Sequence, residues 1–374
     1  MTRNLHIIKN DKFDPSPIFE ATDSKNTYVC ELQTTDEPIY FLNKDLVMGL
    51  TYEGIVSLLK KGEYDNVFFH PLRENWYDLV LAVPDDKNVI WCVFGVELYS
   101  NKFLSRFIKE RMSIYLPETE KWVIAHGYKT PFRLKSFIKN LIKRPIYRRR
   151  CREAIKRVNY VAPIFANEME LLQQIRGFRA KYFPFQYTRW SVNNDFGCKS
   201  KENGQYILLG NSGYPVNNHL DALKVLKERG IINRKLYLPM AYGDAQYKDK
   251  VRKSLDGMGF CYTIQETMIP YLEYQRVVKA CDVVIIPSVR QHASDTIYMN
   301  LLQGAKVYLY ENSVAYKFLT SEGIKVFSIE KDISSISITE DLPQDVIQSN
   351  RQKVLELVSI EKTVERLQIA LDNI

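Results

Sequence analysis

The stretch that most constrains the fold is 206–226, which reads YILLGNSGYPVNNHLDALKVL. Its apolar run stops at Gly210, a polar turn follows, and Leu220, Leu223 and Leu226 then recur at helical spacing. This order predicts a parallel strand, a tight loop and a helix. Such a turn presents backbone N–H groups and the positive end of a helix dipole, which suit a phosphate or diphosphate. An ordinary turn that binds nothing fits this stretch alone equally well.

Strand and helix patterns alternate from 206 onward, and the alternation predicts a doubly wound parallel sheet of the α/β class. We expect strands at 206–209, 235–239, 261–264, 283–287, 306–310 and 325–328. Helices are expected between them at 218–229, 247–257, 271–280, 296–303 and 314–321.

The N-terminal part of the chain shows a similar alternation. It predicts strands at 5–8, 39–42, 67–69, 89–94 and 160–163, and helices at 51–61, 98–112 and 168–175. Because 374 residues are too many for one compact core, we expect two domains. The expected division is an N-terminal domain at 1–185, a linker at 186–204, a C-terminal domain at 205–344 and a final amphipathic helix at 345–374 that packs back across both domains.

Composition narrows the class of protein. The chain is 45% hydrophobic and 26% charged, as ordinary globular proteins are. No apolar run approaches the roughly 20 residues that cross a bilayer, and the N-terminus lacks a signal-peptide core, so we expect a cytoplasmic protein. The six cysteines form no CxxC pair and the five histidines show no ligand spacing. Free thiols therefore fit better than disulfides, and no metal site is expected.

The positive charge is concentrated in one segment, 129–157, which has twelve Lys or Arg and a single acidic residue, Glu153. The whole chain has a net charge of only +8, so the remainder is slightly acidic. One basic patch on an otherwise slightly acidic protein indicates that this patch binds a local anionic surface. It does not indicate a protein whose whole surface is positively charged to bind nucleic acid.

This basic segment contains an amphipathic helical pattern that Pro145 is expected to end. A helix of this kind suits an anionic membrane surface, here the inner face of the cell membrane. A core-facing helix with a solvated basic side is the alternative, and RNA binding is a weaker third option because no RNA module accompanies it. The apolar positions are Leu134, Phe137, Ile138, Leu141 and Ile142, and the opposite side has Lys135, Lys139 and Lys143.

Three loops should gather at the sheet edge where open α/β sheets bind ligands: GNSG at 210–213, PMAYGD at 239–244 and VRQHASDT at 289–296. Arg290 can form paired hydrogen bonds to a diphosphate and neutralise the charge of a leaving nucleotide, although a surface ion pair is its plain alternative. Glu266 can bind a ribose or sugar hydroxyl, or merely cap a helix. The candidate nucleotide-binding residues are Gly210, Asn211, Ser212, Gly213, Asn217, Pro239, Met240, Tyr242, Glu266, Tyr274, Arg290, Gln291, Ser294 and Thr296.

The candidate catalytic residues are Glu97, His70 and Arg290. His70 and Glu97 follow the expected strands at 67–69 and 89–94, where site residues of α/β sheets are found. Either can act as a general base. A half-buried loop histidine and a helix N-terminal charge are their respective alternatives. The chain has no GxGxxG followed by an acid, which disfavours a dinucleotide enzyme, and no GxxxxGK[ST], which excludes a P-loop NTPase.

These residues carry a resemblance to the bacterial family of 4-acetamido-4,6-dideoxygalactose (Fuc4NAc) transferases, which extend a polyprenyl-diphosphate-linked oligosaccharide from a dTDP-sugar. The motifs that resemble the family are LLGNSG with NNH, PMAYGD with Tyr247, ETMIPY with Tyr274, Cys281 with Asp282, Arg290 with Gln291, and Gln303 with Gly304. FFH at 68–70, Trp91, GVELY at 95–99 and YFP at 182–184 resemble it more weakly. The chain departs from the family pattern at His292–Asp295, where the family is glycine-rich, and at Glu97, where we expect Asp.

The resemblance implies a GT-B fold, with two Rossmann-like doubly wound domains facing a central cleft, donor bound mainly by the C-terminal domain and acceptor by the N-terminal one. From the resemblance, together with the basic segment at 129–157 and the absence of metal-ligand spacing, we expect a metal-independent transferase that is peripheral to the membrane. It should move a deoxy- or acetamido-deoxy-hexose such as Fuc4NAc or fucose from a nucleotide diphosphate sugar to a lipid-linked glycan. A GT-B nucleotide-sugar epimerase is the main rival. A non-catalytic module that binds anionic lipid or polysaccharide is the second.

Overall fold

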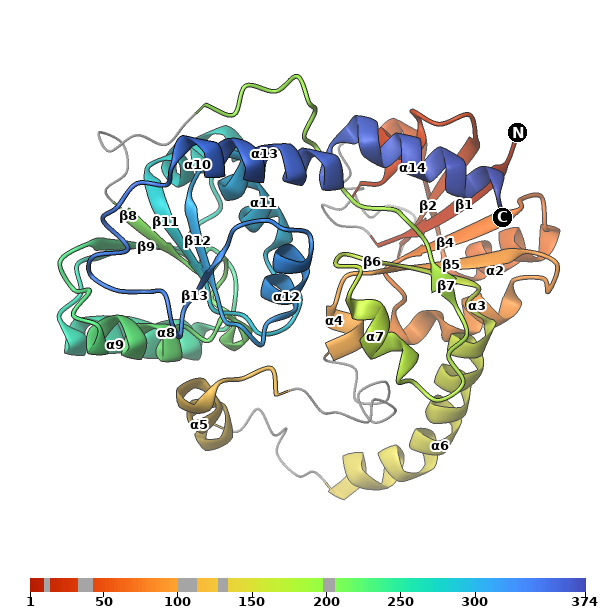
Figure 1. Ribbon diagram of the computed structural model, residues 1–374. Coiled ribbons are helices and arrows are strands. Elements are labelled where there is room, and N and C mark those ends of the chain that lie inside the picture. The colour runs from red at the N-terminus through yellow and green to blue at the C-terminus, as the bar shows by residue number, and fades with distance from the viewer. Residues whose placement is uncertain (10–13, 33–42, 100–112, 127–133, 198–205) are drawn as a thin grey trace. The chain divides into compact units, whose positions relative to one another are not determined.

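The computed structural model describes residues 1–9, 14–32, 43–99, 113–126, 134–197 and 206–374 (Figure 1). These form two compact units. The first unit comprises Met1–Arg111, Phe132–Val192 and Leu357–Ile374, and the second comprises Met112–Pro131 and Asn193–Glu356. The expected strand at 39–42, most of the expected helix at 98–112, and Cys198 lie outside the described residues.

The first unit is built on a parallel sheet with the strand order β3-β2-β1-β4-β5-β6-β7. Because β1 lies between β2 and β4, the chain reverses its direction of winding between β1 and β4, and this is the switch point of the sheet. The strands β2 and β3 were not expected from the sequence. The strands are β1 (Arg3–Ile8), β2 (Lys25–Glu31), β3 (Val47–Leu50), β4 (Asn66–His70), β5 (Asn88–Val93), β6 (Tyr160–Pro163) and β7 (Lys181–Tyr182).

Alternating side chains of this sheet enter two cores. Leu5 and Ile7 of β1 pack on one side, against α2 (Tyr52–Lys61), α3 (Tyr77–Ala82) and the end of α6 (Leu134–Arg157). Ile8 packs on the other side, with α1 (Ser16–Phe19) and α14 (Ile360–Asp372). The short helices α4 (Val96–Tyr99) and α7 (Glu168–Gln173) follow β5 and β6.

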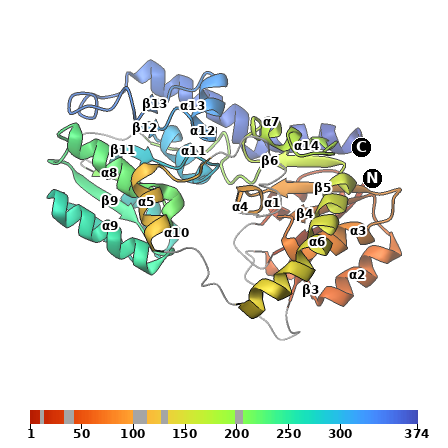
Figure 2. The same ribbon diagram turned by 90° about the horizontal axis from the view of Figure 1, so that it is seen from below.

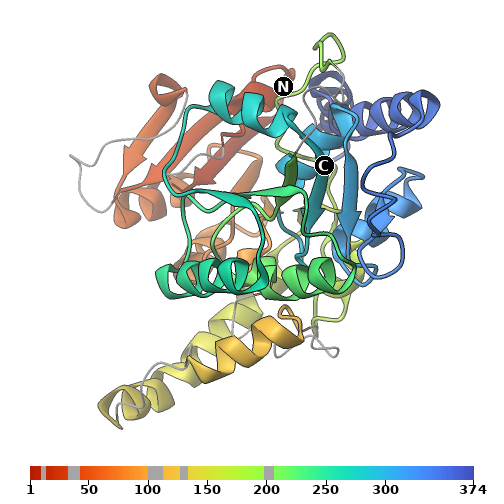
Figure 3. The ribbon, with the colours of Figure 1, turned by 90° about the vertical axis from the view of Figure 1, so that its left-hand side faces the viewer.

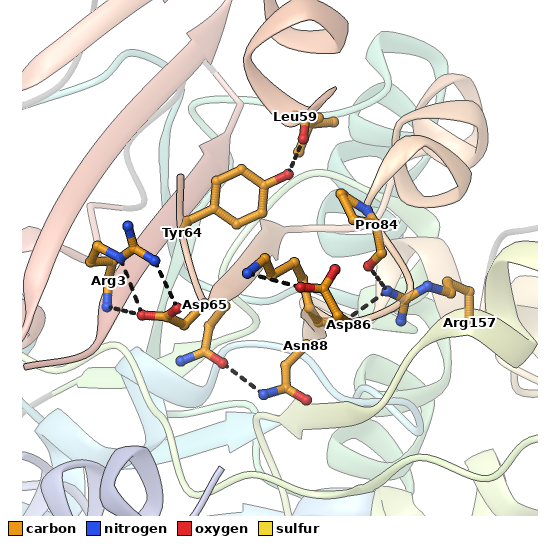
Figure 4. Close-up of polar contacts among 10 residues, drawn as sticks. Arg3, Leu59, Tyr64, Asp65, Pro84, Asp86, Asn88 and Arg157 are labelled. Carbon is orange, nitrogen blue, oxygen red and sulfur yellow. Dashed lines mark hydrogen bonds and ion pairs between the residues drawn. The ribbon is translucent and has the colours of Figure 1, made fainter. Parts of the chain in front are cut away.

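Polar side chains close the amino end of the first sheet (Figure 4). The amide of Asn66 donates to Asn4 at 3.0 Å, and the amide of Asn88 donates to Asn66 at 3.0 Å. Asn4 in turn donates to Asn26 at 3.0 Å, so asparagines link four adjacent strands. Arg3 pairs with Asp65 beside this row at 3.1 Å. Because each buried amide has a partner, the row adds no unpaired polar group to the core.

The second unit contains the doubly wound sheet that the alternation predicts. Its parallel strands have the order β10-β9-β8-β11-β12-β13, which is the arrangement of a dinucleotide-binding fold, with the switch point between β8 and β11. Each expected strand and helix is present within a few residues of its predicted bounds. The strands are β8 (Tyr206–Leu209), β9 (Lys235–Pro239), β10 (Tyr262–Gln265), β11 (Cys281–Ile286), β12 (Lys306–Leu309) and β13 (Phe327–Ser328).

Helices cover this second sheet. Figure 3 shows α8 and α9 next to each other, in green, along one face. Leu223 of α8 and Val251 of α9 lie in the same core as Ile207 and Leu209 of β8. The helices of the unit are α5 (Pro117–Ala125), α8 (His219–Glu228), α9 (Ala245–Met258), α10 (Tyr271–Lys279), α11 (Ser294–Leu302), α12 (Val314–Ser321) and α13 (Gln344–Val358).

Two helices differ from their expected form. The final segment, expected as one helix, is divided at Ser359, whose side chain accepts a hydrogen bond from the Lys362 amide and so starts α14 as a new helix. The prediction that Pro145 ends the basic helix is wrong, because α6 continues through Pro145 to Arg157. A proline within a helix removes one backbone hydrogen bond, and packing of the residues that follow can offset that loss. Here Cys151, Ala154 and Ile155 of α6 are buried in the first core.

One segment belongs to a different unit from the one its sequence position suggests. Residues 113–126 lie within the expected N-terminal domain, but they cluster with the second unit. The expected linker also differs, because its first part, up to Val192, clusters with the first unit. The last helices divide between the units, with most of α13 in the second and α14 in the first.

Candidate functional site

The three candidate loops of the second unit do come together, at the carboxyl ends of β8, β9 and β11. The amide of Gly210 donates to the carbonyl of Ile285 on β11 at 2.9 Å. Ser288 donates from its hydroxyl to the Val216 carbonyl at 2.9 Å, which joins the loop after β11 to the loop after β8. Since β8 and β11 flank the switch point, these loops lie where open α/β sheets bind ligands.

Asn217 organises the loop after β8. Its side-chain amide donates to the Ser212 carbonyl at 2.9 Å and to the Ser212 hydroxyl at 2.8 Å, and its oxygen accepts from the Asn211 amide at 3.2 Å. Asn217 and Ser212 are both fully buried. Asn217, expected as a ligand contact, therefore serves first to fix the shape of the loop. The positive φ of Gly210, +71°, allows the sharp turn that starts it.

Two glycines join the loops after β8 and β9. Gly213 donates from its amide to the Tyr242 carbonyl at 2.8 Å, and its own carbonyl accepts from the Asp244 amide at 3.1 Å. A Cβ on Gly243 would lie 2.3 Å from the carbonyl carbon of Gly213, which is closer than any side chain tolerates. The close approach of the two backbones therefore requires glycine at 243.

The start of α8 is less open to an anion than the strand, loop and helix pattern suggests. The His219 amide, the first of the helix, donates to the Tyr247 hydroxyl at 3.0 Å. With the amides of Gly210, Asn211 and Gly213 also bonded within the protein, much of this turn is already satisfied. The His219 side chain is buried beside Gly210, and burial lowers its pKa to about 3, so the ring is neutral.

The loop after β11 leads into α11. Arg290 and Gln291 are each only 6% exposed, and the Arg290 guanidinium donates to the Gln291 carbonyl at 2.9 Å. Ala293 precedes the helix with a left-handed backbone, φ +57°. Ser294 and Thr296 form the first turn of α11, and Thr296 lies near Tyr274 on α10, where it opposes part of the rise in the pKa of Tyr274 that burial causes. The structure thus brings together five of the predicted residues around the start of α11.

The other predicted residues have different surroundings. Met240 is fully buried and Pro239 is buried beside it, so these side chains face the protein interior. Tyr242 is 40% exposed, and its ring lies 6.1 Å from that of Tyr214. Glu266 is exposed and forms an ion pair with Arg252 of α9. Its carboxylate is therefore neither a helix cap nor free of a charged partner.

In the first unit, His70 ends β4 beside the switch point. It is 2% exposed, and both ring nitrogens are hydrogen-bonded, Nε2 to His6 Nδ1 at 3.1 Å and Nδ1 to the Tyr187 hydroxyl. Burial, and secondarily the neighbouring His6, hold the pKa of His70 well below its usual range. His70 is therefore a neutral, buried histidine whose ring nitrogens are hydrogen-bonded to His6 and Tyr187.

Glu97 lies at the start of α4, after β5. One carboxylate oxygen accepts from the Phe94 amide at 2.6 Å and from the Trp91 indole at 3.2 Å. The side chain is 8% exposed. These contacts fix the turn between β5 and α4, and Glu97 lies in the first turn of α4, which is the helix N-terminal position given as the alternative to a catalytic base.

Several residues that shape these sites were not among the predicted site residues. Asn218 and Asp221 connect α8 to the segment around α5, Tyr247 caps α8, and His6 and Tyr187 bind His70. Tyr187 falls in the expected linker. The NNH and Tyr247 elements of the family resemblance were the available signals for Asn218 and Tyr247.

Neither a metal cluster nor a membrane-spanning helix is found in the described part of the chain. No group of three or more His, Cys, Asp or Glu side chains suited to a metal occurs among the described residues. Within the same ranges, no helix combines the length and the apolar character needed to cross a membrane.

Comparison with known proteins gives one family and one fold. The model of the family described as 4-alpha-L-fucosyltransferase, glycosyl transferase group 56, matches residues 143–358, more than half of the chain. HepE of Anabaena, solved in complex with UDP and glucose, is similar with a TM-score of 0.64 and 11% identity over 100% of both chains. A glycosyltransferase from Rickettsia africae gives 0.58 and 12% identity over 99% of this chain and 98% of that one. Sucrose-phosphate synthase of Thermosynechococcus elongatus gives 0.61 and 10% identity over 100% and 99%. At these identities the structures show the fold alone, which is GT-B.

Proposed function

Because the chain belongs to the 4-alpha-L-fucosyltransferase family, glycosyl transferase group 56, we propose that it transfers a deoxy- or acetamido-deoxy-hexose from a nucleotide diphosphate sugar to a polyprenyl-diphosphate-linked oligosaccharide. Fuc4NAc and fucose are the proposed sugars, and dTDP is the proposed nucleotide of the donor. The observation that carries the proposal is the gathering of three loops, with Arg290, at the switch point of the second unit. The family makes the chain a glycosyltransferase, and the identity of donor and acceptor is what we propose beyond it.

The donor diphosphate is proposed to bind at the start of α11. The first turn of a helix attracts anions through its amides and dipole, and Arg290 lies in the loop that leads into this helix. Arg290 would neutralise the charge that develops on the leaving nucleotide, as arginine does with diphosphates. The loop after β8 would complete this site from the other side of the switch point. The nucleoside is proposed to lie toward Glu266 and Tyr242, which are exposed.

The transfer is proposed to need no metal ion. A guanidinium and a helix N-terminus can neutralise a leaving diphosphate, which is the task that a metal performs in other enzymes. Turnover measured with a chelator present should therefore equal turnover without it. A loss of activity that added magnesium restores would contradict this part of the proposal.

The acceptor is proposed to bind in the first unit, near Glu97 and His70. If transfer inverts the anomeric centre, Glu97 would take the proton of the acceptor hydroxyl, and His70 is the second candidate. Through the hydrogen bonds that they form, both residues also shape the carboxyl edge of this sheet. A retaining transfer would need no base at this place.

The lipid-linked acceptor agrees with a proposed contact between α6 and the inner face of the cell membrane. Ile146 and Tyr147 are 54% and 41% exposed, next to Arg149 and Arg150, whose charges are paired with Glu153 and Asp78. Exposed apolar and basic residues on one helix suit the interface of an anionic bilayer. The apolar and lysine positions at 134–143 involve side chains outside the described ones.

The donor is tested by measuring thermal unfolding with dTDP, UDP and GDP. A nucleotide that binds the native state raises the unfolding temperature, and we expect dTDP to raise it most. Arg290→Gln should remove most of the shift, whereas Arg229→Gln, which changes an exposed arginine of the same unit that donates to the Glu330 carbonyl, serves as the matched control. An equal shift in wild type and Arg290→Gln would contradict the proposed role of Arg290.

The membrane contact is tested by flotation with vesicles that contain anionic lipid. Replacing Lys135, Lys139 and Lys143 with glutamine should release the protein from the vesicles, since each basic residue near the surface contributes about 1 kcal/mol. Replacing Lys227, Lys235 and Lys253 of the second unit is the control of equal charge. Unchanged flotation of the first variant refutes the contact.

A further inference from the structure

The segment 113–126, which we call the inserted segment, separates two parts of the first unit in sequence and packs on the second unit. It contains α5, and Figure 2 shows α5 beside α8. Trp122 of the segment is 6% exposed and lies in the core of the second unit, with its ring 5.1 Å from that of Tyr247. The inserted segment is therefore an integral part of that unit.

Asp221 of α8 provides the cap of α5. One carboxylate oxygen accepts from the Glu118 amide at 2.8 Å, and the other accepts from the Thr119 amide at 3.0 Å and the Thr119 hydroxyl at 2.6 Å. These are amides of the first turn of α5, whose own cap position, Leu116, has no side chain suited to the task. A negative charge at this place also favours the dipole of α5.

Asn218 connects the inserted segment to the loops after β8 and β11. Its oxygen accepts from the Leu116 amide at 2.9 Å, and its amide donates to the Ile114 carbonyl at 3.2 Å. The same amide lies 3.1 Å from the carbonyl of Pro287, at the end of β11, and 3.4 Å from that of Val216 in the loop after β8. Asn218 is fully buried and has a left-handed backbone, φ +48°.

Tyr115 is the next link to the proposed donor site. Burial raises the pKa of Tyr115, and the positive charge of Arg290 nearby opposes part of that rise. The side chain is partly exposed. The inserted segment thus reaches the loops after β8 and β11 through the hydrogen bonds of Asn218, and Tyr115 lies in the vicinity of Arg290.

We propose that the inserted segment is part of the donor site, and that Asn218 and Asp221 are positioning residues that keep the loop after β8 in its binding conformation. Asp221 binds the segment, the segment binds Asn218, and Asn218 binds the loop. The predicted effect on nucleotide binding rests on the proposed function. The predicted effect of the inserted segment on the conformation of the loop after β8 does not. Within the described part of the chain, the side-chain hydrogen bonds of Asp221 all go to the inserted segment, so removal of its carboxylate acts first on that segment.

The test uses the full chain with Asp221→Ala, Thr119→Val and Asn218→Gly. Thr119→Val removes one hydrogen bond and keeps the shape of the side chain, and Asn218→Gly removes the side chain while allowing the left-handed backbone. Lys224→Ala is the control, because Lys224 pairs with Glu118 across the same helices without joining the loop. Hydrogen exchange without ligand should be about tenfold faster at 210–217 in Asp221→Ala and Asn218→Gly than in the control.

The second readout is nucleotide binding, with whichever of dTDP, UDP and GDP binds the wild type. The Kd should rise about tenfold in both variants, and KM for the donor should rise while kcat at saturating donor stays within about twofold. Exchange at 210–217 that equals the control in every folded variant overturns the inference. If no nucleotide binds the wild type, the proposed function fails, and the exchange measurement still decides the conformational link. If Asp221→Ala does not fold, Thr119→Val and Asn218→Gly decide it.

Discussion

The Nδ1 of His6 lies 3.1 Å from the Nε2 of His70, and this pair joins β1 to β4 at the switch point of the first unit. Asn26 fixes the protons of the pair. Its oxygen accepts from His6 Nε2 at 3.4 Å, so His6 Nδ1 is an acceptor and His70 Nε2 is the donor to it. His70 Nδ1 then accepts from the Tyr187 hydroxyl. The chain of hydrogen bonds is complete only while both rings are neutral.

Acid should therefore destabilise the first unit. Burial lowers the pKa of His6 to about 3 and that of His70 well below its usual range, so between about pH 6.5 and the folded pKa the unfolded state binds more protons. Stability that is present above about pH 6.5 is lost as the pH falls, by about 1.4 kcal/mol per pH unit for each histidine. Urea unfolding at several pH values measures this slope. His6→Phe should lower the slope, and an unchanged slope would contradict the assignment.

Glu97→Gln separates a catalytic from a structural role. Glutamine keeps an oxygen that can accept from the Phe94 amide and the Trp91 indole, so stability should change by less than about 1 kcal/mol. If Glu97 is the base, kcat should fall about 10²- to 10⁴-fold with the nucleotide Kd unchanged. Steady-state kinetics measure kcat, and calorimetry measures the nucleotide Kd. Normal turnover would leave Glu97 only its role in the turn.

Gly243→Ala should disrupt the junction of the loops after β8 and β9. The new Cβ would overlap the Gly213 backbone, and the φ of +138° disfavours any side chain, so we expect a loss of about 2–4 kcal/mol in the free energy of unfolding. Gly257→Ala is the control, since it is helical and a Cβ there meets nothing within 4 Å. That change should stabilise the protein by up to about 1 kcal/mol. Equal effects of the two substitutions would contradict the close approach.

Ala293→Gly should stabilise the protein. Alanine at 293 has the left-handed backbone that glycine adopts without cost, so the change should add about 0.5–1 kcal/mol to the free energy of unfolding. Ala315→Gly, within α12, should instead destabilise by about 1 kcal/mol. Chemical denaturation of both variants tests the sign. A loss of stability in Ala293→Gly would show that the strain is absent.

The sequence predicted the second unit far better than the first. Strands such as 206–209 and 235–239 are short apolar runs followed by helices of clear period, and both were located at their observed bounds. In β2, by contrast, the exposed Lys25 and the polar Asn26 and Thr27 hide the strand pattern, since these residues act at the amino end of the sheet. Pro145 misled because local preference was overridden by the packing of Cys151 and Ala154.

The candidate site was predicted in its place but not in its contacts. Glycines and the ends of apolar strands located the three loops, because tight turns and close backbone contacts require particular residue types. Periodicity could not show that Asn217 is used within its own loop, or that Tyr247 occupies the first amide of α8. Nor could it place the inserted segment on the second unit, since contacting residues such as Thr119 and Asp221 are distant in sequence.

The division of the C-terminal segment at Ser359 has a consequence for synthesis of the chain. Leu367 and Leu371 of α14 are buried beside Ile18 and Phe19, near the other end of the sequence. The second unit, which ends at Glu356, emerges from the ribosome before these leucines do. The first unit therefore starts to be synthesised first but completes its core last. Its apolar surface stays uncovered until Leu371 has been synthesised.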